Sequence, residues 1–90
     1  MDQILNEMND LTKKVHNSIE EWKNYQKKYS SLIKYYQSQQ WFTDYTSYEH
    51  GEFDFKSEVL TDNGVYNLLT AQHNLALNAI KTATSTLEND

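Results

Sequence analysis

Apolar residues recur along the first part of the chain at alternating intervals of four and three. The stripe consists of Ile4, Met8, Leu11, Val15, Ser18, Trp22, Tyr25, Tyr29, Leu32 and Tyr36, with Ser18 as its one polar member. This spacing is the a/d pattern of about five heptads, and it predicts one long amphipathic helix over residues 2–39. Lysines and glutamates fall off the stripe, where we expect them to face water.

A second long helix is predicted over residues 62–88, where two apolar stripes run side by side. One stripe holds Val65, Leu68, Leu75 and Ala79; the other holds Tyr66, Leu69, Ala76, Ile80, Ala83 and Leu87. So wide an apolar face is typical of a helix that packs against two partners. Thr61 provides an N-cap, and Asp62 adds negative charge at the positive end of the helix dipole.

The connector, residues 40–60, contains the stretch WFTDYTSYEHGEFDF, with six of the chain's twelve aromatic residues. Trp41 and Tyr45 lie four residues apart, which predicts either a short helix from Gln40 to about Ser47 or a bent continuation of the first helix. Gly51 marks a turn, because glycine accepts a positive φ without steric penalty.

These elements predict a single all-α domain, an antiparallel hairpin of two long helices closed at one end by the aromatic connector. Two helices alone bury little apolar surface, so a short chain needs additional support. The first turns of the long helix, around Ile4 and Met8, lack a partner within the hairpin. A homodimer forming a four-helix bundle would cover them, and a monomeric three-helix arrangement is the alternative.

The composition narrows the class of protein. The chain of 90 residues has a net charge of −5, no cysteine and no proline. A negative chain is a poor nucleic-acid binder, because phosphate contacts need a basic face. No apolar run is long enough to span a membrane, and the amphipathic, acidic start does not resemble a signal peptide. We therefore expect a cytoplasmic protein that binds neither nucleic acid nor membrane.

Negative charge is concentrated in the connector. Residues 40–62 carry six acids against one lysine, Lys56, and so account for the whole net charge. One interpretation is structural: the rings close the end of the hairpin while the acids stay solvated. The other is an exposed patch that binds a basic protein partner, with rings as anchors and carboxylates steering its approach. The candidate partner-binding residues are Trp41, Phe42, Asp44, Tyr45, Tyr48, Glu49, Glu52 and Asp54.

Nothing in the sequence indicates catalysis, and we expect no catalytic residue, cofactor or metal. His16 and Glu20 have a spacing that can hold a metal, but one such pair is a weak signal because sites need three or four ligands. His50 is explained by the polarity of the turn, and His73 by a position at the edge of the core. No phosphate-binding glycine loop or catalytic triad is present.

The segments YYQSQQWFTDY and VLTDNGVYNLL resemble a family of small bacterial proteins catalogued as a domain of unknown function, found mostly in Gram-positive bacteria and their phages. Its most specific matches are Trp41, Asp44 and Tyr45, then Val59, Leu60, Asp62, Val65, Tyr66, Asn67 and Leu68. Ser57 and Glu58 depart from the family's pattern, which has a basic residue and a glycine there. The resemblance implies a helical bacterial cytoplasmic protein and brings no activity, cofactor or established partner.

Two functions follow from these observations. The first is a small helical protein that acts by protein–protein binding, as an adaptor or regulator. The alternative is an inhibitor from a phage or mobile element that presents carboxylates in place of DNA phosphates. An enzyme is not expected.

Overall fold

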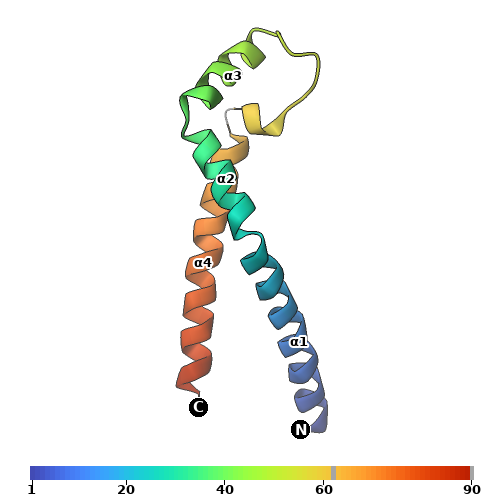
Figure 1. Cartoon of the computed structure of the whole chain (residues 1–90). Coiled ribbons are helices and arrows are strands. Elements are labelled where there is room, and N and C mark those ends of the chain that lie inside the picture. The colour runs from blue at the N-terminus through green and yellow to red at the C-terminus, as the bar shows by residue number, and fades with distance from the viewer. Residues whose placement is uncertain (62, 90) are drawn as a thin grey trace. The chain divides into compact units, whose positions relative to one another are not determined.

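The computed structural model describes residues 1–61 and 63–89, and all regular structure within them is helical (Figure 1). In chain order the elements are α1 (Asp2–Asn24), α2 (Gln26–Tyr36), α3 (Gln39–Glu49), the short 3-10 helix η1 (Glu58–Leu60) and α4 (Gly64–Glu88). No strand occurs in this described part, which confirms the predicted all-α class. The chain forms two compact units that divide between Tyr35 and Tyr36. None of the helices described is both long and apolar enough to cross a membrane.

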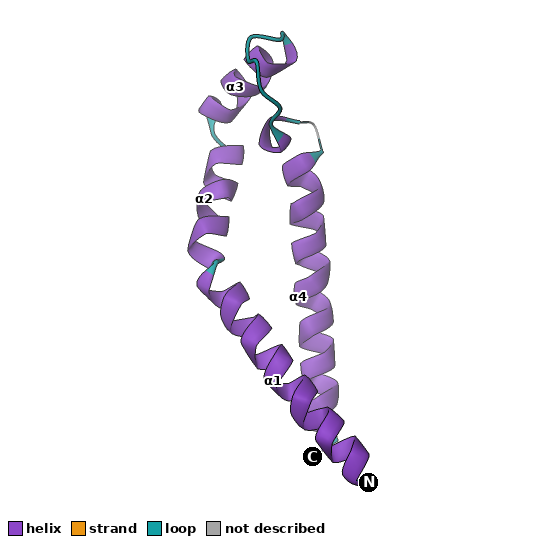
Figure 2. Ribbon diagram, turned by 90° about the vertical axis from the view of Figure 1, so that its right-hand side faces the viewer, coloured by secondary structure: helices purple, strands orange, loops and turns teal. Residues whose placement is uncertain are grey.

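The first unit holds α1 and most of α2, and its helix changes direction at Tyr25 (Figure 2). There the carbonyl oxygen of Trp22 accepts hydrogen bonds from the Tyr25 N–H at 3.3 Å and from the Gln26 side-chain amide at 3.2 Å. A side chain that bonds into the i→i−4 ladder is a recognised cause of a kink. Main-chain hydrogen bonds continue through the kink, because the Tyr25 N–H donates to the Glu21 carbonyl and the Tyr29 N–H donates to the Tyr25 carbonyl.

A second interruption separates α2 from α3 at Ser38. This residue has an extended backbone (φ −91°, ψ 159°), and its hydroxyl oxygen accepts from the Trp41 N–H at 3.2 Å. That bond is an N-cap, which satisfies one of the free amides at a helix start. The expectation of a single helix over residues 2–39 is therefore wrong: two helices, α1 and α2, occupy this range and α3 begins at Gln39. The apolar period does not encode local side-chain bonds such as the Ser38 cap.

The turn after α3 is built on Gly51, as the sequence predicts. Gly51 has a φ of +74°, its N–H donates to the Tyr48 carbonyl at 3.0 Å, and the Glu52 N–H donates to the Ser47 carbonyl at 3.1 Å. This pair of bonds is a Schellman motif, which closes a helix on a left-handed residue. The short helix predicted over Gln40–Ser47 is confirmed as α3.

The start of α4 is held by Thr61. Its hydroxyl donates to the Glu58 carbonyl at 2.7 Å and accepts from the Gly64 N–H at 3.1 Å. The assigned N-cap residue is Asn63, which makes no side-chain bond, so Thr61 does perform the predicted capping from three residues ahead of Gly64. A Cβ on Gly64 would overlap the Glu58 carbonyl oxygen. The charge expected from Asp62 lies outside the described residues.

The buried core of the second unit is small and lies where η1 meets α4. Leu60 is 5% exposed and Val65 is 3% exposed, and η1 contacts both α3 and α4. Figure 1 shows this 3-10 turn, in yellow, beside the first turn of α4. Further along α4 the apolar side chains of Leu75, Ile80 and Leu87 are exposed. The packing is therefore concentrated at one end of α4, next to the aromatic connector.

Candidate functional site

Six aromatic residues in and next to the connector form what we call the ring cluster: Tyr36, Trp41, Tyr45, Tyr48, Phe53 and Phe55. Trp41 lies at the centre of the first half of this cluster. Its ring packs edge-on against Tyr36 at 4.9 Å between centroids and stacks on Tyr45 at 5.0 Å. Its indole N–H donates to the carbonyl oxygen of Val59 at 2.7 Å. Helix α3 sets this geometry by placing Trp41 and Tyr45 one turn apart on the same face.

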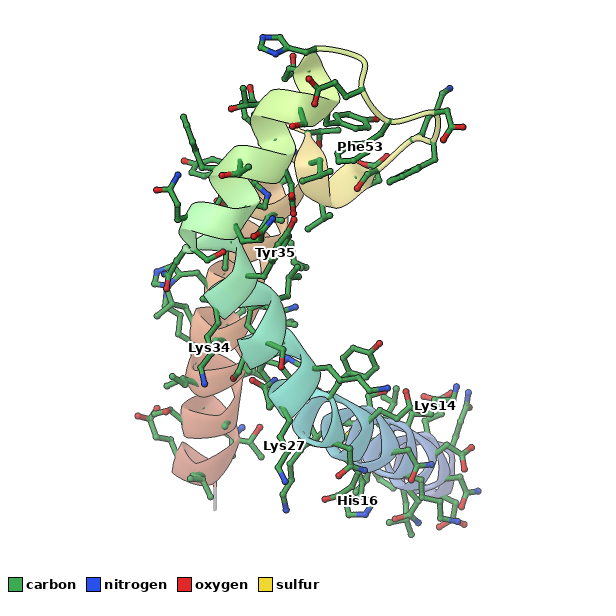
Figure 3. All side chains as sticks on the ribbon, turned by 45° about the horizontal axis from the view of Figure 1, so that its top comes forward. Lys14, His16, Lys27, Lys34, Tyr35 and Phe53 are labelled. Atoms are coloured by element: carbon green, nitrogen blue, oxygen red, sulfur yellow. The ribbon has the colours of Figure 1, made fainter. Side chains whose placement is uncertain are left out.

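The other half of the ring cluster joins the end of α3 to the loop that follows. Phe53 stacks on Phe55 at 5.3 Å and packs at 6.4 Å from Tyr48. The Tyr48 hydroxyl accepts a hydrogen bond from the Ser57 N–H at 3.0 Å. Figure 3 shows Phe53 between α3 and this loop. Residues at both ends of the loop are thus tied to α3, which supports the structural interpretation for these rings.

Two rings remain largely in solvent. Phe42 is 59% exposed and Phe55 is 58% exposed, whereas Trp41, Tyr45 and Tyr48 are half-buried. The predicted partner-binding residues are therefore divided. Three of the candidate rings contribute to the fold of the second unit, and Phe42 alone among them faces outward.

The candidate acids also separate. Asp44 is half-buried and its carboxylate accepts from the Gln40 side-chain amide at 2.8 Å. Glu49, Glu52 and Asp54 are exposed and follow one another around the Gly51 turn. The structure thus places Glu52, Asp54 and the exposed Phe55 ring on the loop after α3, with Glu49 at the end of α3 and Asp44 within it.

The histidines form no site in the described residues. No group of three or more His, Asp or Glu side chains there is arranged to hold a metal ion. His16 projects from α1 on a different side from Lys14 (Figure 3). His73, expected at the edge of the core, is exposed on α4.

The apolar stripe of α1 is open to solvent. Ile4 and Met8 are each 55% exposed, Val15 is 54% exposed, and Leu11 and Ile19 are each 50% exposed. The sequence identified this stripe as a seam to be buried. No element of the first unit other than the continuing helix α2 is available to cover it.

Several residues of the connector were missed as contributors to its geometry. Ser38 lies within the helix predicted over residues 2–39 but caps α3, and serine is among the residues preferred at a helix N-cap. Val59 and Ser57 supply main-chain groups to Trp41 and Tyr48, and such backbone partners leave no trace in a pattern of side chains.

These features describe a small helical protein with an aromatic, acidic bend and an uncovered amphipathic helix. The chain belongs to the family described as a domain of unknown function (DUF4298), whose sequence profile matches residues 1–82. The predicted resemblance to a domain of unknown function is confirmed at that level. Searches of curated proteins and of solved structures return no significant match.

Proposed function

We propose that this protein is a helical protein-interaction module, and that the apolar face of α1 is its main binding surface. The observation that carries the proposal is that every aliphatic residue of this stripe from Ile4 to Val15, and Ile19 beside it, is at least half exposed. Contiguous apolar surface of this kind on a soluble protein marks an interaction site.

Helix stability supports the same conclusion. An isolated helix is marginal in water even at about 15 residues, and most helical stability in proteins comes from packing of an apolar face. The α1 helix spans 23 residues and has no buried residue. A polypeptide partner that covers the stripe would supply the missing packing energy.

The acidic loop around Gly51 is a second, smaller surface in this proposal. Phe55 offers an exposed ring beside the carboxylates of Glu49, Glu52 and Asp54, and Phe42 offers another on α3. Rings and carboxylates together suit a partner with a basic surface. Trp41, Tyr45 and Tyr48 would support this surface from behind rather than touch the partner.

The proposal includes the hairpin of long helices and its assembly into a homodimeric four-helix bundle, in the bacterial cytoplasm. It is a binding role without catalysis, cofactor, nucleic acid or membrane. The competing function is inhibition by mimicry of DNA, in which carboxylates stand in for phosphates. Its only support is the set of exposed carboxylates around the Gly51 turn. A basic partner whose binding survives high salt and the changes Glu49→Gln, Glu52→Gln and Asp54→Asn would exclude the mimic.

Site-specific photo-crosslinking in the host cell tests the binding surface. A photoreactive phenylalanine analogue at Met8 is expected to form a crosslinked species with another polypeptide, either a second copy or a different protein. The same analogue at Lys13, on the polar side of α1, is the matched control and should remain uncrosslinked. Equal crosslinking at both positions, or none at Met8, would contradict the proposal.

A further inference from the structure

Charged residues alternate in sign along one edge of the α1 stripe. In heptad notation the stripe occupies positions a and d. The residues just before the a positions are Glu7, Lys14, Glu21, Lys28 and the uncharged Tyr35. The charged g positions therefore read negative, positive, negative, positive. The opposite edge, position e, holds Leu5, Thr12, Ile19, Gln26 and Ile33 and carries no charge.

Charges at positions e and g set the partner and the orientation of packed helices. When two copies of a helix run antiparallel, the g edge of one faces the g edge of the other. In one register the two-fold axis passes midway between Lys14 and Glu21. Lys14 then lies opposite Glu21 of the second copy, and Glu7 lies opposite its Lys28. Two-fold symmetry repeats both pairs, so all g charges meet an opposite charge.

The same register matches the apolar layers. It places Met8 opposite Tyr25 of the second copy and Leu11 opposite its Trp22. The aliphatic half of one stripe therefore packs against the aromatic half of the other. This arrangement pairs large side chains with smaller ones along the seam.

Other arrangements of two α1 helices lose this complementarity. A parallel pair would set the charged g edge against the e edge, which is apolar or neutral throughout. An antiparallel pair shifted by one heptad would place Glu7 opposite Glu21 and Lys14 opposite Lys14 of the second copy, and like charges in contact are destabilising. The alternation of sign thus selects one orientation and disfavours the nearest slipped register.

The α4 helix does not offer the same match. Its residues, Gly64–Glu88, include only Lys81 and Glu88 as charged side chains, and its flanks are asparagine, threonine and glutamine. The alternating charges of α1 would find no ordered partners there.

We propose that the occupant of the α1 face is a second copy of this chain, paired antiparallel through Glu7–Lys28 and Lys14–Glu21 contacts. This inference rests on the proposed interaction role and names its partner.

The kink at Tyr25 does not disturb the central contact, because Lys14 and Glu21 both lie in α1. At the kink, main-chain bonds from Tyr25 and Tyr29 continue the i→i−4 pattern toward Lys28. In the single chain its ammonium group lies 5.0 Å from the centre of the Tyr25 ring.

Two complementary variants test the pairing at low salt. An acidic variant carries Lys14→Glu and Lys28→Glu, so that all of its charged g positions are negative. A basic variant carries Glu7→Lys and Glu21→Lys, so that all are positive. We expect the unchanged chain to sediment at about twice its 10.6 kDa. Each variant alone should show a dimer dissociation constant raised by a factor on the order of ten or more, and an equal mixture should recover the dimer.

A matched control changes the same charges on the polar side of the helix. Lys13→Glu with Lys27→Glu alters net charge as the acidic variant does, yet should dimerise as the unchanged chain does. A monomeric unchanged chain, or variants that are unaffected alone or fail to recover on mixing, would overturn the inference. Should Met8 crosslink only to a different protein while the purified chain is monomeric, the interaction role survives and this pairing fails.

Disulfide trapping gives an independent test that does not depend on charge. The chain has no cysteine, so single substitutions are unambiguous. A Met8→Cys chain mixed with a Tyr25→Cys chain should form the mixed disulfide under mild oxidation, and neither chain should crosslink alone. A disulfide between two Met8→Cys chains would show parallel pairing and would contradict the inference.

Discussion

The indole N–H of Trp41 donates a 2.7 Å hydrogen bond to the carbonyl oxygen of Val59, which lies 18 residues further along the chain. This bond joins α3 to η1, and η1 in turn holds the buried Leu60. Trp41 therefore acts as a structural link within the second unit, and its ring is only partly available to any partner.

Replacing Trp41 by phenylalanine should keep most of the ring packing and lose this hydrogen bond. The part-buried Val59 carbonyl would then lack its donor, at an expected cost of about 1 kcal/mol in the free energy of unfolding. Urea unfolding followed by far-ultraviolet circular dichroism measures the change. An unchanged unfolding midpoint would show that the bond contributes nothing to the fold.

Phe42 and Tyr45 provide a matched comparison between an exposed ring and a ring packed in the fold. Phe42→Ala should change the unfolding free energy by less than about 0.5 kcal/mol, because the ring is already in solvent. Tyr45→Ala removes a ring stacked on Trp41 and should cost about 1–3 kcal/mol. Similar losses from both variants would mean that Phe42 belongs to the core rather than to an exposed surface.

The two glycines should respond differently to substitution. Gly64→Ala puts a methyl group against the Glu58 carbonyl and should destabilise the second unit by about 1–3 kcal/mol, since the obstacle is backbone. At Gly51, nothing lies within 4 Å of an added Cβ, and asparagine tolerates left-handed φ, so Gly51→Asn should cost under about 1 kcal/mol. Thermal unfolding of both variants provides the measurement. A more damaging change at Gly51 would refute this account of the start of α4.

Helix type and approximate extent could be read from the sequence, but the interruptions could not. The second long helix, predicted over residues 62–88, is described as α4 over Gly64–Glu88, and the turn at Gly51 was also predicted. The break at Tyr25 coincides with a side-chain amide bonded to the Trp22 carbonyl, and the break at Ser38 with a hydroxyl cap. Each is a local bond too small to alter a heptad pattern.

The sequence predicted which segment holds the candidate site, but it did not predict which of its rings are packed and which are exposed. Clustering of rings and acids identified residues 41–55, yet periodicity alone did not separate Trp41 from its neighbour Phe42. The inward position of Trp41 depends on the Val59 carbonyl, a main-chain group far along the chain. The stripe of α1 was predicted as a buried seam, and its exposure in a single chain is the basis of the proposed binding surface.

Hydrogen exchange of the α1 amides, measured as a function of protein concentration, tests the central claim that a second copy covers the α1 stripe. Protection of the main-chain amides over residues 8–21 should rise with concentration, because pairing stabilises a helix that is marginal alone. Protection that is already high at the lowest concentration and does not change, or rapid exchange at every concentration, would contradict the account.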